Sequence, residues 1–151
     1  DRLMGAGLKG VPMIVAPGAT DLVDYPAWGE MPSRFAGRPS HAHNRLIASV
    51  GIDAEMRREL ARELARRLRQ AQGPVHLVLP VQGIEEWDRP GAPLHDAEGL
   101  AALMDECGQC DWGATEVSRI DAHINDAAFV QQVLAVLDDW VARGLVKKDV
   151  P

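Results

Sequence analysis

The sequence contains few cysteines, few aromatic residues and fewer cationic than anionic residues. Two cysteines in 151 residues are too few for a disulfide-stabilised secreted scaffold, so a reducing, cytoplasmic location is expected. Lysine and arginine number 16 against 22 aspartate and glutamate, for a net charge of −6. This balance disfavours nucleic acid and anionic membrane surfaces as partners, because binding to phosphate requires clustered positive charge.

Several sequence patterns that would indicate a function are missing. No apolar run is long enough to cross a bilayer, and residues 1–10 lack the basic start and apolar stretch of a signal peptide. There is also no Gly-Lys-Ser/Thr loop and no Gly-x-Gly-x-x-Gly motif for binding nucleotide phosphates. The sequence therefore does not by itself establish a reaction.

Three apolar runs predict buried strands, at Val11–Ala16, Val75–Leu79 and Glu116–Ile120. The first two are continuous, as in strands covered on both faces, whereas the third is weaker and is expected nearer an edge.

Three segments with helical spacing alternate with these strands, at about 53–71, 97–107 and 127–143. Asp53 and Asp96 are expected to cap the first two. The third is expected to bury its apolar residues, which are Phe129, Val130, Val133, Leu134, Leu137, Trp140 and Val141.

The alternation of strands and helices predicts a Rossmann-like, three-layer α/β unit with a mostly parallel sheet. Two long connections remain, 17–52 and 80–95, and the first is expected to hold a short strand near 45–50. Three strands are few for such a sheet, and residues 2–9 resemble the end of a helix closed by Gly10. Residues 1–151 are therefore expected to form a single domain, the carboxyl-terminal subdomain of a longer protein whose amino-terminal subdomain is its partner.

Polar residues follow each predicted strand, where open parallel sheets bind ligands. The candidate residues are Gly18, Thr20 and Asp21 after the first strand, Gln82 and Gly83 after the second, and His123, Asn125 and Asp126 after the third. Their convergence predicts a ligand site.

Each group also has a structural interpretation. Gly18 and Thr20 suit either a small anion-binding nest or an ordinary turn. His123 suits a general acid/base or a hydrogen-bonded structural residue, and either Asn125 or Asp126 is expected to cap the following helix. The spacing of His41 and His43 is a weak indication of metal binding, and no metal site is predicted.

Four segments occur in the order typical of a known family: Val11–Asp21, Met31–Arg38, His43-Asn44 and Asp121–Asp126. The sequence resembles the carboxyl-terminal half of an uncharacterised protein family that includes the ATP-binding, virus-inhibiting domain of a plant resistance protein against tomato mosaic virus. The resemblance implies two α/β subdomains in tandem, ATP with Mg²⁺ as a ligand held mainly on the first, and self-association into a homo-oligomer. It also adds His43 and Asn44 to the candidate ligand-binding residues.

The sequence departs from the family at two places. Residues 47–52 replace a stretch that usually contains Met-Arg-Thr-Thr, and Pro80-Val81-Gln82-Gly83 replaces Pro-Leu-Arg-Gly. The absence of both arginines predicts a different ligand or weaker binding, because arginine pairs well with phosphate and carboxylate.

Three functional hypotheses follow. The first is a ligand-binding subdomain of a nucleotide-dependent protein, with its site at the carboxyl ends of the strands. The second is an enzyme site completed by the other subdomain, in which His123 is the acid/base and Asp21 or Asp126 orients it. The third is a structural or oligomerisation domain.

Overall fold

The computed structural model describes residues 3–146 and contains two three-stranded sheets. The larger sheet is parallel, with the order β1-β5-β6. Its strands are β1 (Met13–Val15), β5 (Val75–Pro80) and β6 (Glu116–Ile120). These strands confirm the prediction from the three apolar runs, and β6 lies at an edge as its weaker pattern indicates.

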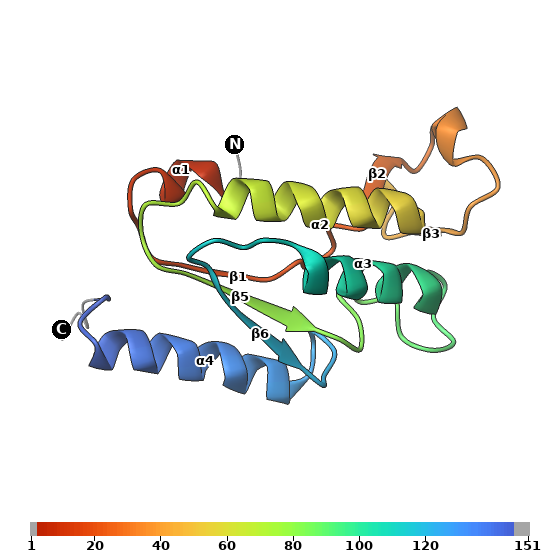
Figure 1. The fold of residues 1–151 in the computed structure, drawn as a ribbon. Helices are drawn as coiled ribbons and strands as arrows, with labels where there is room; N and C mark the ends of the chain where they lie inside the picture. The colour runs from red at the N-terminus through yellow and green to blue at the C-terminus, as the bar shows by residue number, and fades with distance from the viewer. Residues whose placement is uncertain (1–2, 147–151) are drawn as a thin grey trace.

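Helices cover both faces of the parallel sheet (Figure 1). On one face, α2 (Ala54–Leu68) and α3 (Ala97–Gln109) pack against each other, with the short α1 (Met4–Gly7) beside α2. On the other face, α4 (Ala127–Ala142) packs on β5 and β1. The predicted three-layer α/β arrangement is therefore confirmed.

Two aspartates begin α2 and α3 as predicted. The carboxylate of Asp53 accepts a hydrogen bond from the Met56 N–H at 2.8 Å, and that of Asp96 accepts one from the Gly99 N–H at 2.8 Å. Such caps satisfy amide groups that have no partner within the helix. They fix where each helix starts, just beyond the loops at the carboxyl ends of the strands.

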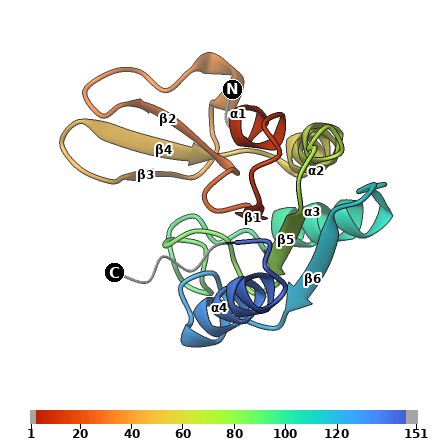
Figure 2. The ribbon, with the colours of Figure 1, turned by 90° about the vertical axis from the view of Figure 1, so that its left-hand side faces the viewer.

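The connection between β1 and α2 forms the second, antiparallel sheet, which lies to one side of the parallel sheet (Figure 2). Its order is β2 (Leu22–Pro26), β4 (Ile47–Gly51) and β3 (Ser40–Ala42). The strand expected near 45–50 corresponds to β4, whereas β2 and β3 were expected to be loop. β3 is short and largely polar, and β2 carries Asp24 and Pro26 among its apolar residues, so pairing with β4, and not local sequence, determines their conformation. Phe35, in a short 3₁₀ helix (Ser33–Phe35), packs with Val50 beneath them.

The sequence predicted more buried residues on α4 than the structure shows. Phe129 and Trp140 are buried, but Val130, Leu134 and Leu137 are 51%, 51% and 37% exposed. The apolar arc of this helix is wider than the face that the sheet covers, so half of it faces outward. Even so, none of the helices between residues 3 and 146 has the length and apolarity needed to cross a membrane.

Candidate functional site

The three loops that leave the parallel strands meet at one edge of the sheet, as predicted. Backbone hydrogen bonds join them. The Ala19 N–H donates to the Ile84 carbonyl at 2.9 Å, and the Ile124 N–H donates to the Gly83 carbonyl at 3.0 Å. The loops after β1, β5 and β6 therefore form one connected surface.

His123 lies at the centre of this surface and is completely buried. Its Nδ1 accepts a hydrogen bond from the Asn125 N–H at 3.1 Å, so the neutral ring carries its proton on Nε2. Nε2 lies 2.8 Å from Oδ1 of Asp88. The other carboxylate oxygen of Asp88 accepts from the N–H groups of Ile84, at 2.5 Å, and Glu85, at 3.1 Å. Asp88 therefore connects the loop after β5 to the loop after β6.

Gly83 makes room for the Asp88–His123 pair. Its φ of +141° is rarely adopted by residues with a side chain, and a Cβ there would overlap both the Asp88 carboxylate and the His123 ring. The residue was predicted to contact a ligand, and the side chains nearest to a Cβ added there are those of Asp88 and His123.

Glu85 is a titratable residue that the sequence analysis did not identify. It is 4% exposed, one carboxylate oxygen accepts from the Trp87 N–H at 2.6 Å, and the other has no partner among the described residues. Burial, together with the negative charges of Asp21 and Asp88, raises the pKa of Glu85 to about 7. A carboxyl group with such a pKa can accept or donate a proton near neutral pH.

Asp21 pairs with an arginine. Its carboxylate lies 3.1 Å from the guanidinium of Arg57, which is also 3.5 Å from the carboxylate of Asp96. Asp21 and Arg57 are 1% and 2% exposed. Burial raises the pKa of Asp21, although the charge of Arg57 opposes this effect. The carboxylate expected to orient the His123 ring was Asp21 or Asp126, and the structure places Asp88 against the ring, whereas Asp126 bonds the His123 backbone.

Two cavities of about 320 Å³ each meet at Trp87. One is lined by Glu85, Glu86, Asn125 and the Gly18-Ala19 turn, together with Ile84 and Ile124. The other lies against the antiparallel sheet and is lined by residues that include Asp24, His43 and Ser49. The Trp87 ring lies 4.8 Å from that of His41 and 4.9 Å from that of His43. The two cavities form a cleft that Trp87 divides, with the antiparallel sheet on one side and the loops after β1, β5 and β6 on the other.

The other predicted residues are only partly gathered here. The Thr20 hydroxyl donates to the Pro17 carbonyl at 2.8 Å within its own turn. The Ala19 N–H of the same turn donates to the Ile84 carbonyl of the loop after β5. Asn44 accepts from the amides of Leu46 and Ile47 in the β3–β4 turn.

Asp126 precedes α4 in the capping position, but its carboxylate accepts from the His123 N–H at 2.9 Å and pairs with Arg89 at 2.7 Å.

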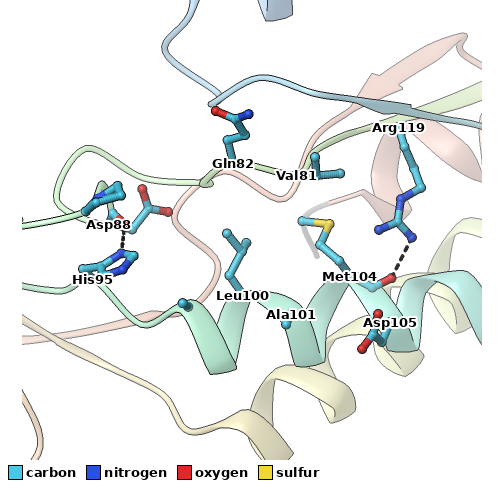
Figure 3. A pocket seen from close by; sticks show the side chains of 11 residues that line it. Val81, Gln82, Asp88, His95, Leu100, Ala101, Met104, Asp105 and Arg119 are labelled. Atoms are coloured by element: carbon cyan, nitrogen blue, oxygen red, sulfur yellow. Dashed lines mark hydrogen bonds between the residues drawn. The ribbon is translucent and has the colours of Figure 1, made fainter.

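Gln82 lines a different cavity, of about 480 Å³, between α3 and the loops, and its side chain points away from α3 toward the loop after β6 (Figure 3). Its amide donates to Asp121 at 2.7 Å. Asp88 also borders this cavity. Its backbone carbonyl accepts a hydrogen bond from Nδ1 of His95 at 2.7 Å. Within residues 3–146, no group of three or more His, Cys, Asp and Glu side chains is arranged to hold a metal ion.

Comparison with protein families identifies the chain. Residues 1–141 match the model described as "Uncharacterised protein family (UPF0261) C-terminal domain". The chain belongs to the UPF0261 family. This confirms the resemblance inferred from its sequence motifs.

Its relatives are considerably longer. A UPF0261 protein of Brucella melitensis is 49% identical over 148 residues, which cover 98% of this chain and 35% of the relative. A UPF0261 protein of Mesorhizobium japonicum is 30% identical, over 91% of this chain and 35% of the relative. The ToMV resistance protein Tm-1(GCR237) of Solanum lycopersicum is 27% identical, over 83% of this chain and 17% of the relative. The chain thus spans about a third of the length of its bacterial relatives.

Replacement of Gly83 tests the close packing around the Asp88–His123 pair in this UPF0261 domain. We expect Gly83→Ala to lower the free energy of unfolding by about 3 kcal/mol, because backbone strain adds to the overlap. Gly91→Ala is the matched control, since Gly91 has a φ of +87° and open space around it. We expect it to cost only about 1–2 kcal/mol. Equal losses in urea denaturation would contradict the packing described.

The buried carboxyl group of Glu85 should make stability depend on pH. Its pKa is about 7 in the folded protein and 4.5 ordinarily, so the folded state binds the proton more tightly. Stability should therefore fall as pH rises from about 4.5 to 7. Glu85→Gln, which mimics the protonated group, should remove this fall and stabilise the domain by about 1–3 kcal/mol above pH 7. Urea denaturation between pH 5 and 8 measures the change in the free energy of unfolding with pH. Glu30→Gln, at an exposed position, is the control. Parallel pH profiles of Glu85→Gln and the unmodified protein would refute the assignment.

Proposed function

We propose that this domain binds a small-molecule ligand at the carboxyl ends of its parallel strands, as one wall of a site in a longer, nucleotide-dependent protein. The observation that supports this most is the pair of cavities that meet at Trp87. Their combined size is typical of small-molecule sites. They also lie where open parallel sheets usually bind ligands.

The walls of the cleft favour a ligand with a flat ring and hydrogen-bonding groups. Trp87 and His43 offer aromatic surfaces, and the unpartnered oxygen of Glu85 lies beside the cavity that Asn125 lines. An aromatic ring can stack on indole, and a hydroxyl or amine of the ligand can donate to the carboxylate.

The charges around the cleft disfavour direct contact with phosphate. The arginines beside it, Arg57 and Arg89, are each paired with aspartate. The lining itself includes Asp24, Glu85 and Glu86. Phosphate groups of ATP would therefore be held with Mg²⁺ and by residues of the preceding polypeptide. The nucleotide part of the proposal is supported by the family resemblance and not by a phosphate-binding loop in this domain.

Ligand binding is tested by thermal unfolding of this chain and of a longer protein in which the chain replaces the matching region of the Brucella relative. ATP–Mg²⁺, ADP and a sugar phosphate are the probes. A ligand at 100 times its Kd stabilises the native state by about 2.7 kcal/mol, so the melting temperature should rise by several degrees.

Trp87→Ala should abolish this shift. Trp28→Ala, at a 73% exposed position outside these cavities, should preserve it. No shift with any probe in either protein would contradict nucleotide binding, whereas a shift unaffected by Trp87→Ala would place the ligand elsewhere.

An enzyme site completed by the preceding polypeptide is a second candidate, favoured by the unpartnered oxygen and raised pKa of Glu85. We propose that Glu85 transfers the proton. His123 was predicted as the acid/base, but its ring is enclosed and both of its nitrogens are bonded. In this proposal His123 positions the loop that carries Glu85, through Asp88.

Phosphate release from ATP–Mg²⁺ by the longer protein tests this second candidate. We expect Glu85→Gln to lower kcat at least about 100-fold, which is typical for loss of a general acid/base, while the thermal shift with ATP–Mg²⁺ remains. Glu30→Gln should leave the rate unchanged. A Glu85→Gln protein with full activity would exclude the acid/base role.

A further inference from the structure

We propose that the outer edge of β1 and the adjoining exposed face of α4 form the interface for the polypeptide that precedes this domain in the longer UPF0261 proteins. That polypeptide adds a strand beside β1 and covers the outward apolar residues of α4. Four observations support this interface, and it does not depend on ligand binding.

The first observation is an apolar stripe on α4 that the described residues, 3–146, leave largely exposed. Val130, Leu134, Leu137 and Val141 recur at three- and four-residue spacing, and the first three are 51%, 51% and 37% exposed. We call these four residues the α4 stripe. Isolated exposed apolar residues are ordinary, but an aligned row of them is typical of an interaction surface.

The second observation is the direction of the α4 stripe. The buried row that contains Phe129 and Trp140 faces the sheet, and the α4 stripe lies about 100° around the helix from it. Arg143 lies on the other side of the buried row, 3.9 Å from Glu116 of the edge strand β6. The α4 stripe therefore faces away from β6, toward the β1 edge of the sheet.

The third observation is that β1 has none of the charged residues that protect most free edges. The opposite edge strand, β6, carries Glu116 and Arg119, whereas β1 is Met-Ile-Val. The Met13 N–H donates to the Pro74 carbonyl on the β5 side. Backbone groups alternate along a strand, so Ile14 directs its N–H and C=O away from β5, to the free edge. These groups can pair with another strand.

The fourth observation is a groove of about 400 Å³ beside this edge, on the face opposite α4. Val15, Ala16, Leu60 and Leu64 are among the residues that line it. Its two charged residues, Glu63 and Arg67, pair with each other at 2.6 Å. The groove therefore suits uncharged side chains that project from a strand added to β1.

The lengths of the relatives identify the occupant. This chain spans 35% of the Brucella and Mesorhizobium proteins and matches their family's C-terminal domain. About two thirds of each relative thus precedes or flanks this domain and is covalently attached to it. An attached segment has a high effective concentration, which favours it over a separate partner. A parallel strand from it would place its following loop beside Gly18.

Adjacent substitutions on α4 test the interface. Leu134→Glu lies in the α4 stripe, and Ala135→Glu is the control at the next, also exposed, position. Both are made in this chain and in the longer protein that carries it in place of the Brucella region. We expect Leu134→Glu to lower the melting temperature of the longer protein by about 3 °C or more, because it buries a charge. This chain alone should change by less than about 1 °C, and Ala135→Glu should have little effect in either protein.

Amide hydrogen exchange tests the added strand separately. The Ile14 amide should exchange at least about 10-fold more slowly in the longer protein than in this chain, because a new strand bonds it. The amides of Met13 and Val15, which face β5, are internal controls. Equal exchange at Ile14 in both proteins would overturn strand addition. Equal effects of Leu134→Glu in both would overturn the α4 contact. A dimer of this chain that persists in the longer protein and dissociates with Leu134→Glu would show that a second copy occupies the surface.

Discussion

The carboxylate of Asp88 accepts hydrogen bonds from the Ile84 and Glu85 amides and from the His123 ring, and the candidate site depends on these contacts. They fold the loop after β5 back over the sheet edge and join it to the loop after β6. The fold of this loop in turn encloses Glu85 and places Trp87 against the antiparallel sheet. Loss of the carboxylate would leave buried donors without acceptors, which costs more than the net gain from an ordinary hydrogen bond.

Charge balance inside the domain follows from the same contacts. Asp21, Glu85 and Asp88 are buried, and Arg57 is the one buried lysine or arginine among the described residues. Three ionised carboxylates around one cation would be costly in a poorly solvated region. Burial of Glu85, reinforced by this excess of negative charge, raises its pKa to about 7, and retention of its proton reduces the cost. The same excess of negative charge explains why a ligand here would present neutral or donor groups.

The helices and parallel strands could be predicted from sequence because their apolar periodicity is local. The strands β2 and β3 could not, because a polar stretch such as Ser40–Ala42 becomes a strand only by pairing with β4. That the loops of the candidate site meet at one edge was predictable from the order of strands and helices. The chemistry of the site was not, because the role of Glu85 arises from burial, and that of Asp88 from amides three and four residues earlier in a folded loop. Thr20 and Asn44 bond locally instead.

The antiparallel sheet is entered and left by the chain at one place, and it also contacts Trp87 and α2. It lies between Asp21 and Ile52, and the Ile52 N–H donates to the Asp21 carbonyl at 2.9 Å. This hydrogen bond brings the two ends of residues 22–51 together. The segment is therefore an insertion, and a change in its length would not alter the register of β1 with β5. Such a module can diverge or be exchanged between homologues while the parallel scaffold stays the same. If the proposed ligand binds in this cleft, its selectivity would thus change during evolution through the half that contains His43, with the half around Glu85 preserved.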